Sequence, residues 1–408
     1  MLITNHKTIV LLWILVASAY ILLSKSPTPF DYYTRLSKSM LEGKIYLTEN
    51  PSWLNELITD PKNPSRFFVA YPPMPAIISI PLIFLNKNIS QTTISIIIGS
   101  LNTLLAYLVA KKIISDNNSK TPFWIAILFA FGTNHFFLST VGSAWYFAHI
   151  VSVFFLFLAI LETLSKKRPL LIGLLLGASY WSRLPTILSL PFFLLMTKSE
   201  YISSQKSKIG HWKLAIGNWS LEIGLLFLLK LFLGLLVFLD LNFIYNYLRF
   251  GSIFDIGYTL IPNVLNEPWY QYGIFSIKYI PEHLKIIFTA LPGISNKFPY
   301  INPGFVGLAL WFVTPAFLIA LLAPIKKLVV ISSWLAIFLV SLPSLMHGTV
   351  GFSQFGYRFA MDYTPFLIIL TTLGIGKNIK WPHKLLIFIS VVVNLWGILL
   401  SKMNWANF

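Results

Sequence analysis

The stretch YFAHIVSVFFLFLAILETL, residues 146–164, decides the fold class of this protein. It carries one formal charge, on Glu162 near its end, and as a helix rising about 1.5 Å per residue it can cross a hydrocarbon core of about 30 Å. Comparable runs recur along the 408 residues, of which 56% are apolar and 11% charged, whereas soluble domains average about 25% charged residues. The sequence therefore predicts an all-α polytopic membrane protein.

Apolar runs long enough to be transmembrane helices are about eleven in number. They lie near residues 8–23, 91–110, 122–140, 146–164, 169–182, 184–197, 220–243, 303–323, 328–346, 361–376 and 385–400. The first run encloses a cleavage-like Ala17-Ser18-Ala19, but the apolar residues continue to Leu23. We therefore expect a retained first helix rather than a cleaved signal peptide.

A shorter apolar run at 74–85 decides the expected topology. It has about twelve residues with Pro81 inside, which is short for a span. If it does not cross, the basic clusters all fall on the same side as Lys7; they lie at 111–112, 166–168, 198–213, 326–327 and 377–384. The positive-inside rule then predicts a multi-pass protein of the inner or plasma membrane, with a cytoplasmic amino terminus and an interfacial or re-entrant helix at 74–85.

This topology also accounts for the net charge of +17, so we expect no nucleic-acid partner. It places two long segments, 24–90 and 250–302, outside the cytoplasm, and long loops between transmembrane helices are usually functional or disordered. The first segment holds five of the fourteen acidic residues: Asp31, Glu42, Glu49, Glu56 and Asp60.

The beginning of the first segment has the pattern of a short amphipathic helix. Asp31 stands at a helix-start position, Tyr32, Leu36 and Met40 follow at a spacing of four, and Gly43 provides a stop. We expect this helix to lie on the outer membrane surface.

Several chemistries are excluded by absent motifs. The chain has no cysteine, which excludes disulfides and thiolate sites, and it contains no Walker loop, GxGxxG, HExxH, Asp-x-Asp or GxSxG motif. An enzyme facing outward would need a substrate carried in the lipid, because cytosolic nucleotide donors are absent there.

The polar residues near the outer face allow two interpretations each. Asp31 either caps its helix and pairs with Arg35, or accepts a proton from an acceptor hydroxyl. Arg183 joins two apolar runs of about 14 residues, where it either reaches lipid headgroups or binds a lipid phosphate. Arg358 and Asp362 have the spacing of an ion pair on one helix face.

Three other features are less specific. The glycine-containing loop 347–353 is suited to close over a substrate. Lys230, in the seventh apolar run, is the most buried-looking cation, for which a partner on another helix or snorkelling is the simplest explanation. His135 and His149 flank the second external turn, where a hydrogen-bonded structural role is the usual one.

The order of these features resembles the C-fold (GT-C) glycosyltransferases, and most closely the bacterial group related to protein mannosyltransferases and lipid A aminoarabinose transferases. The resemblance rests on FDYY at 30–33, YPPMP at 71–75, the paired short helices at 177–191 around Arg183, and NYLRFGS at 246–252. It covers roughly residues 8–260, which we treat as the catalytic module, with 261–408 as a second part holding the second external loop and the last helices.

The resemblance implies transfer of a sugar from a polyprenyl-phosphate donor to a glycan, lipid or protein acceptor at the extracytoplasmic face, with membrane lipids as surroundings. Asp31 would be the general base, and Arg183 and Arg358 would bind the donor phosphate. Other substrate-binding residues are expected at Arg35, Tyr71, His149 and Tyr357. Inversion of the anomeric centre is preferred over retention, because a single displacement needs one base.

Many members of that group carry an acidic residue in the second external turn, whereas this chain has VGSAWY at 141–146. No cofactor is indicated, and a divalent metal is an option without support in the sequence. Two other classes stay open. A transporter or flippase of lipid-linked glycans would show internal repeats and central charges. A polymerase or ligase of the O-antigen type would not need the carboxylate-bearing first loop.

Overall fold

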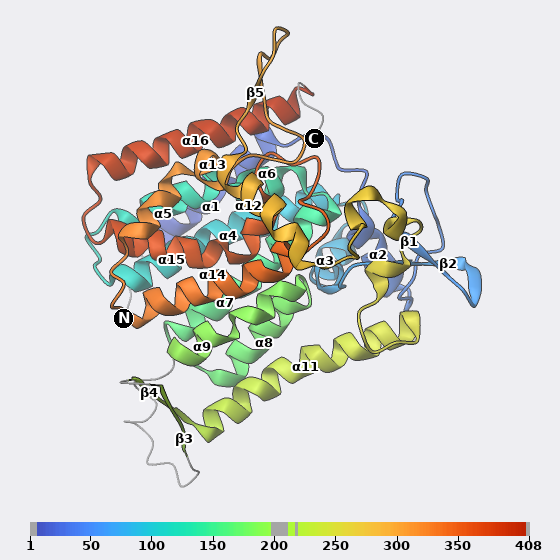
Figure 1. Ribbon diagram of the computed structural model, residues 1–408, viewed down its shortest axis with the longest axis horizontal. Helices are drawn as coiled ribbons and strands as arrows, with labels where there is room; N and C mark the ends of the chain where they lie inside the picture. Colours follow the sequence, from blue (N-terminus) through green and yellow to red (C-terminus); the bar gives the residue numbers. More distant parts are fainter. Residues whose placement is uncertain (1–5, 197–210, 217–218, 405–408) are drawn as a thin grey trace.

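The computed structural model describes residues 6–196, 211–216 and 219–404. Most of these residues are helical, and Figure 1 shows a bundle whose longer helices run broadly in one direction. The basic stretch 198–213 falls largely outside the described residues. The expected all-α character is confirmed, because the few strands pair only in two-stranded hairpins.

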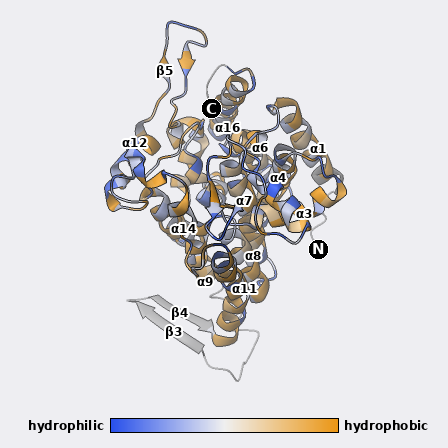
Figure 2. Ribbon diagram, turned by 90° about the vertical axis from the view of Figure 1, so that its right-hand side faces the viewer, coloured by the Kyte–Doolittle hydropathy of each residue, from blue (hydrophilic) through white to orange (hydrophobic). Residues whose placement is uncertain are grey.

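Five helices in the described part of the chain are long and apolar enough to cross a membrane: α4 (Gln91–Ile114), α7 (Ala144–Thr163), α11 (Leu225–Phe250), α14 (Leu328–Leu345) and α16 (Trp381–Lys402). A bent pair, α5 (Thr121–Phe131) and α6 (His135–Val141), makes a sixth if its 50° bend lies within one span. Other apolar helices complete the bundle: α1 (His6–Leu23), α8 (Pro169–Tyr180), α9 (Leu190–Met196) and α15 (Thr364–Ile375). Figure 2 shows that hydrophobic residues predominate along these helices.

Proline explains where apolar runs differ from single straight helices. The run 303–323 contains only α13 (Leu310–Val313) and η6 (Pro315–Leu322), because Pro315 lacks the N–H that a continuing helix requires. The run 184–197 is divided into η1 (Leu184–Ser189) and α9, and the segment after α14 enters α15 through η7 (Arg358–Tyr363). The run 220–243 also begins later than expected, since β3 (His211–Ile216) and β4 (Trp219–Gly224) precede α11.

The first long segment folds against the bundle. It contains α2 (Tyr32–Leu41), the hairpin of β1 (Leu57–Asp60) and β2 (Asn63–Val69), and α3 (Met74–Leu85). The expected helix after Asp31 is confirmed, with Tyr32 and Leu36 buried and Gly43 at φ +75° beyond its end. Ser37 Oγ donates to the carbonyl of Ala76 at 2.7 Å, which fixes α2 against α3.

The second long segment is built from short turns and one helix. They are η2 (Gly257–Leu260), η3 (Val264–Asn266), η4 (Pro268–Tyr270), η5 (Ile277–Tyr279), α12 (Ile280–Thr289), and the hairpin of β5 (Gly293–Ile294) and β6 (Ile301–Asn302). Arg249, at the end of α11, connects this segment to the first. Its buried guanidinium donates to the Val69 carbonyl and to Asn246 Oδ1, and it lies 3.9 Å from the centroid of the Tyr245 ring.

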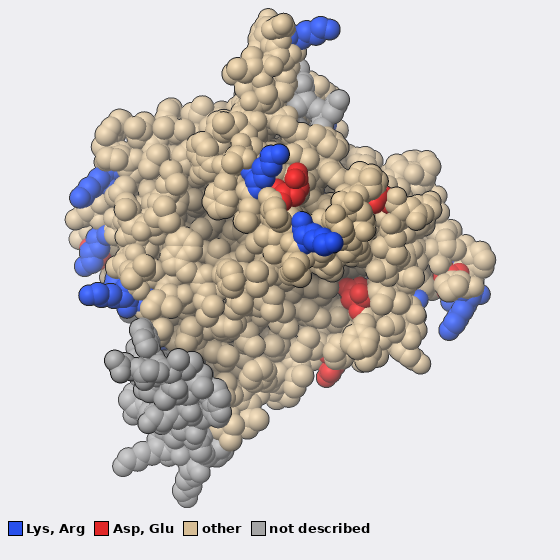
Figure 3. Space-filling view, viewed as in Figure 1, with Lys and Arg blue, Asp and Glu red and all other residues tan. Residues whose placement is uncertain are grey.

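Small residues let two helices of the bundle pack closely, and a hydrogen bond joins two loops at one end of it. A Cβ at Gly173 would lie 2.0 Å from the carbonyl oxygen of Leu231, so α8 and α11 approach closely, as small residues permit in membrane proteins. At one end, Ser119 Oγ donates to the Lys377 carbonyl, which brings the turn after α4 to the basic residues before α16. Figure 3 shows Lys and Arg side chains at the left edge of this face.

Lys230 differs from the expectation of a buried cation. Its side chain is exposed on α11, in the second turn of the helix. A single cluster of buried apolar side chains runs from Leu12 to Ile398, so the segments on both sides of residue 260 contribute to one core.

Candidate active site

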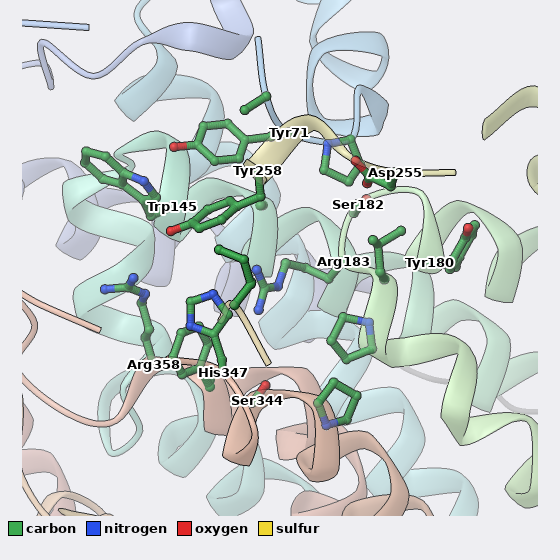
Figure 4. A pocket seen from close by; sticks show the side chains of 18 of the residues that line it. Tyr71, Trp145, Tyr180, Ser182, Arg183, Asp255, Tyr258, Ser344, His347 and Arg358 are labelled. Carbon is green, nitrogen blue, oxygen red and sulfur yellow. The ribbon is translucent and has the colours of Figure 1, made fainter. Parts of the chain in front are cut away.

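A cavity of about 470 Å³ lies where the bundle meets the two long segments described above. Figure 4 shows much of its polar lining: Tyr71 comes from the loop before α3, Trp145 from the start of α7, Arg183 from the break after α8, Asp255 and Tyr258 from the turns after α11, and His347 and Arg358 from the segment between α14 and α15. The volume is in the usual range for small-molecule sites. Residues far apart in the sequence thus line one space.

Arg183 lies at the floor of this cavity because the helix before it cannot continue. α8 ends at Tyr180, and Pro185 starts the next turn, so Arg183 is extended at φ −144°. Its Nη2 donates to Asp362 Oδ2 at 3.0 Å, and its Nε approaches both carboxylate oxygens at 3.3 Å. Asp362 is fully buried, whereas 23% of the Arg183 side chain is exposed to the cavity.

His149 completes this arrangement from the other side. His149 belongs to α7, and its side chain is fully buried. Its Nδ1 lies 2.7 Å from Asp362 Oδ1. Sequence reasoning expected His149 at an external turn and in contact with substrate. The structure instead places it behind Arg183, where it helps to hold the carboxylate that orients the cation.

The expected pairing of Arg358 with Asp362 does not form. Both residues belong to η7, a 3₁₀ helix with about three residues per turn, so positions i and i+4 do not share a face as they would in an α-helix. Arg358 Nη1 donates to the Phe352 carbonyl at 3.1 Å. Within the described residues, no carboxylate lies within 4.0 Å of its guanidinium.

The segment before Arg358 is held by a buried glutamine. Gln354 Nε2 donates to the carbonyls of Val306 and Val350 at 2.8 and 2.9 Å, and its Oε1 accepts from the Arg358 backbone N–H at 3.1 Å. Gly351, at φ +88°, lies so close that an added Cβ would be 2.9 Å from Arg358 Nη1. This segment therefore fixes the position of the guanidinium.

His347 forms another part of the wall. Its ring lies 5.6 Å from that of Tyr258 and 6.0 Å from that of Phe359, and the Thr349 backbone N–H donates to its Nδ1 at 3.2 Å. Burial lowers the pKa of His347 to about 4, so the imidazole is neutral at physiological pH. The glycine-containing loop 347–353 thus lies at the cavity wall.

The two cationic candidates and Tyr71 line the cavity, whereas Asp31, Arg35 and Tyr357 do not. Asp31 accepts from Arg35 Nε at 2.7 Å on α2, and Arg35 also contacts Glu49. Tyr357 is buried, with its hydroxyl 2.7 Å from His283 Nδ1. The Tyr71 hydroxyl is buried and has no hydrogen-bond partner among the described residues.

Sequence reasoning missed Glu56. Its Oε2 accepts from the indole N–H of Trp145, a cavity residue, at 2.9 Å. Burial is the main cause that raises the pKa of Glu56 to about 7. The only signal in the sequence was its membership of the five acidic residues in the first segment.

His135 matches its structural interpretation, since its buried ring lies within hydrogen-bond distance of the Tyr20 hydroxyl, at 3.2 Å. In the part of the chain that the structure describes, no group of three or more His, Asp and Glu side chains is arranged to hold a metal ion. No protein-family model, curated protein or solved structure matches the chain. The chemistry of the cavity is therefore the basis for a functional assignment.

Proposed function

We propose that this protein is an integral membrane glycosyltransferase that moves a sugar from a polyprenyl-phosphate donor to an acceptor at the extracytoplasmic face. The observation that carries the proposal is Arg358. Arg358 is partly buried and has no described carboxylate within 4.0 Å, and such a cation is costly unless an anionic ligand neutralises it. A phosphate fits this requirement, because guanidinium groups bind phosphate oxygens through paired hydrogen bonds.

Arg183 supplies a second cation to the same cavity. Its charge is balanced by Asp362, but nearly a quarter of its side chain remains exposed toward the cavity. As the bond between sugar and phosphate breaks, negative charge develops on the leaving phosphate. Two fixed guanidinium groups stabilise that charge without reorganisation, which is an effective form of catalysis in a partly water-excluded site.

The remainder of the lining suits a lipid carrier. Five apolar residues line the cavity from the break after α8 and from the end of α14: Leu184, Pro185, Ile187, Leu188 and Pro343. An isoprenoid chain would lie along this side while its phosphate faces Arg183 and Arg358. The cavity thus combines an apolar side and a cationic side, as a phosphoisoprenoid requires.

The proposal includes the finer topology of a GT-C fold. The bent and shortened apolar helices would complete about eleven spans, with the basic ends of α4 and α16 in the cytoplasm and α2, α3 and the cavity on the opposite side. A carboxylate in the first external segment would then reach the acceptor hydroxyl. Asp31 is the residue that the resemblance to GT-C enzymes assigns to this role.

The test is transfer in reconstituted proteoliposomes supplied with a panel of radiolabelled polyprenyl-phosphate sugars and an extract of envelope glycans, lipids and proteins as acceptors. We expect labelled product with the wild type, and loss of product together with weakened binding of polyprenyl phosphate in Arg358→Ala. Arg66→Ala is the matched control, because Arg66 belongs to the same external face but stacks on Tyr46.

Two outcomes would replace the proposal with another class. Movement of intact lipid-linked sugar across sealed vesicles without transfer identifies a flippase. Elongation or transfer of a whole lipid-linked glycan, with no use of single-sugar donors, identifies a polymerase or ligase.

A further inference from the structure

Of the acidic residues that the structure describes, Asp255 alone lines the cavity. It follows α11 in the turns that open the second long segment, and its side chain is exposed. The carboxylate of Asp362 lies behind Arg183 and is fully buried, so a ligand in the cavity does not reach it. Asp31 precedes α2 and does not line the cavity. A carboxylate that touches the substrate is therefore to be sought at Asp255.

The backbone after Asp255 holds its side chain in place. The Gly257 backbone N–H donates to Asp255 Oδ1 at 3.3 Å. Gly257 is buried, and an added Cβ would lie 2.9 Å from the carbonyl oxygen of Ala70, so this turn packs against the first long segment. Asp255 Oδ2 makes no hydrogen bond to any described residue. The carboxylate is thus held through one oxygen and open at the other.

No neighbouring cation neutralises Asp255. In the described part of the chain, no basic side chain lies within 4.0 Å of its carboxylate. Arg249 acts on it from farther away, but the guanidinium of Arg249 donates to the Val69 carbonyl and to Asn246 Oδ1. Desolvation by the cavity walls raises the pKa of Asp255, and the charge of Arg249 opposes this rise. The carboxylate is therefore available to a ligand.

The two cations and Asp255 occupy different parts of the cavity. In the view of Figure 4, Arg183 lies between Asp255 and Arg358. A phosphate that faces Arg183 and Arg358 leaves the part of the cavity next to Asp255 to the other reactant. In a single displacement the acceptor oxygen attacks the anomeric carbon from the side opposite the leaving phosphate, and the base belongs on that side. Asp255 meets this requirement.

We propose that Asp255, rather than Asp31, is the general base of the glycosyl transfer; this inference rests on the proposed function. Asp255 Oδ2 takes the proton of the acceptor hydroxyl while the acceptor oxygen bonds to the anomeric carbon. The bond from that carbon to the phosphate oxygen breaks, and polyprenyl phosphate leaves with the electron pair, facing Arg183 and Arg358. Asp255 then passes the proton to water.

Position and pairing distinguish Asp255 from Asp31. Asp31 accepts from Arg35 Nε at 2.7 Å, and an ion-paired carboxylate is a weaker base because its negative charge is stabilised. One cavity carboxylate among the described residues also fits inversion at the anomeric carbon. Retention through a double displacement would need a nucleophile in addition to the base.

The first experiment compares Asp255→Asn with Asp31→Asn and with the control Asp116→Asn, in full-length protein reconstituted in nanodiscs. Asp116 is the matched control because its Oδ1 also accepts from a backbone N–H two residues later, at 2.9 Å, in the turn between α4 and α5. We expect Asp255→Asn to lower kcat by about 100-fold or more, with the Kd for polyprenyl phosphate unchanged. The other two variants are expected to transfer at close to the wild-type rate.

Three results of this comparison would overturn the assignment. The first is transfer by Asp255→Asn at the wild-type rate. The second is a loss of transfer confined to Asp31→Asn. The third is a loss of polyprenyl-phosphate binding together with transfer in Asp255→Asn, because this result would show that Asp255 supports the shape of the cavity rather than the proton transfer.

The second experiment adds sodium formate to Asp255→Ala, because a small carboxylate in the vacated space can accept the proton in place of the side chain. We expect formate to raise transfer by this variant at least about tenfold and to leave the wild type unchanged. No rescue in an Asp255→Ala variant that still binds polyprenyl phosphate would contradict the role of a base. If the wild type transfers no sugar from any donor, the proposed function fails; if the wild type and the Asp255 variants transfer equally, only the base assignment fails.

Discussion

Arg183 approaches both carboxylate oxygens of Asp362 although 179 residues separate the two in the sequence. The pair joins the break after α8 to the 3₁₀ turn before α15, and His149 reaches the same carboxylate from α7. Three separate helical elements thus meet at one buried charge. The position of Arg183 in the cavity depends on this contact, because Asp362 is the only described carboxylate within 4.0 Å of it.

Replacing Asp362 with Asn should lower the free energy of unfolding by about 3 kcal/mol. This value is at the lower end of the range for breaking a buried ion pair, because the side chain of Arg183 is partly exposed to the cavity. The measurement is thermal unfolding in detergent. Glu162→Gln removes a carboxylate that also pairs with an arginine, but Arg168 is 56% exposed, so the loss there should be about 1 kcal/mol or less. Equal effects of the two substitutions would contradict the burial argument.

Replacing Arg358 with Ala should weaken binding of polyprenyl phosphate by about 10- to 100-fold, corresponding to about 1.5–3 kcal/mol for hydrogen bonds to a charged group. Binding is measured by titration calorimetry in nanodiscs, with neutral polyprenol as the comparison ligand. The affinity for polyprenol should not change. A similar loss for both ligands would show that the cavity has collapsed rather than lost a cation.

Replacing Gly351 with Ala should also weaken phosphate binding, because the new methyl group would lie 2.9 Å from Arg358 Nη1 and displace it. Gly43→Ala is the matched control. Gly43 has a similar φ of +75°, but nothing lies within 4 Å of its added Cβ, so it carries the backbone strain without the collision. We expect both variants to lose about 1 kcal/mol of stability, and only Gly351→Ala to lose affinity.

Stability should fall as the pH rises from about 4.5 to 7, and Glu56→Gln should remove part of that fall. The carboxyl ionises near pH 4.5 in the unfolded chain and near 7 in the folded protein, so over this range the folded state binds more protons and loses stability as pH increases. The shift corresponds to at most about 3 kcal/mol. Because Glu56 is partly exposed, we expect about 1 kcal/mol from denaturant unfolding at pH 5 and pH 8.

The lack of cysteine makes the proposed orientation directly measurable. Ser52→Cys lies exposed in the first long segment, and Asn118→Cys lies exposed between α4 and α5. A membrane-impermeant thiol reagent added to intact cells should label position 52, whereas position 118 should react only after permeabilisation. The reverse pattern would place the cavity on the cytoplasmic side and exclude a donor site at the external face.

Helices without internal proline were predictable from the sequence. The apolar runs of α4, α7 and α16 match the observed helices to within a few residues at each end, because length and composition suffice there. The run around Pro315 was not predictable in this way, since apolar composition does not register the missing backbone donor. The helix after Asp31 was found because its spacing and its glycine stop are local signals.

The two cavity cations were also predictable, since an arginine beside apolar runs requires an explanation. Their partners were not. Asp362 was expected to pair with Arg358, which lies four residues earlier in the sequence. Because η7 is a 3₁₀ helix, Asp362 instead contacts Arg183. Glu56 was indistinguishable from the other acids of its segment until the position of Trp145 was known. Contacts across long sequence separations are set by packing, which no local pattern encodes.

Arg249 imposes a constraint on any attempt to redesign the two long loops. Its guanidinium is bound by the Val69 carbonyl, and a Cβ on Gly257 would lie 2.9 Å from the carbonyl oxygen of Ala70. The end of β2 in the first long segment and the turn at Gly257 in the second are thus complementary in shape. Grafting a foreign first loop onto this scaffold would require its cognate second loop as well, so the two form a single exchangeable cassette.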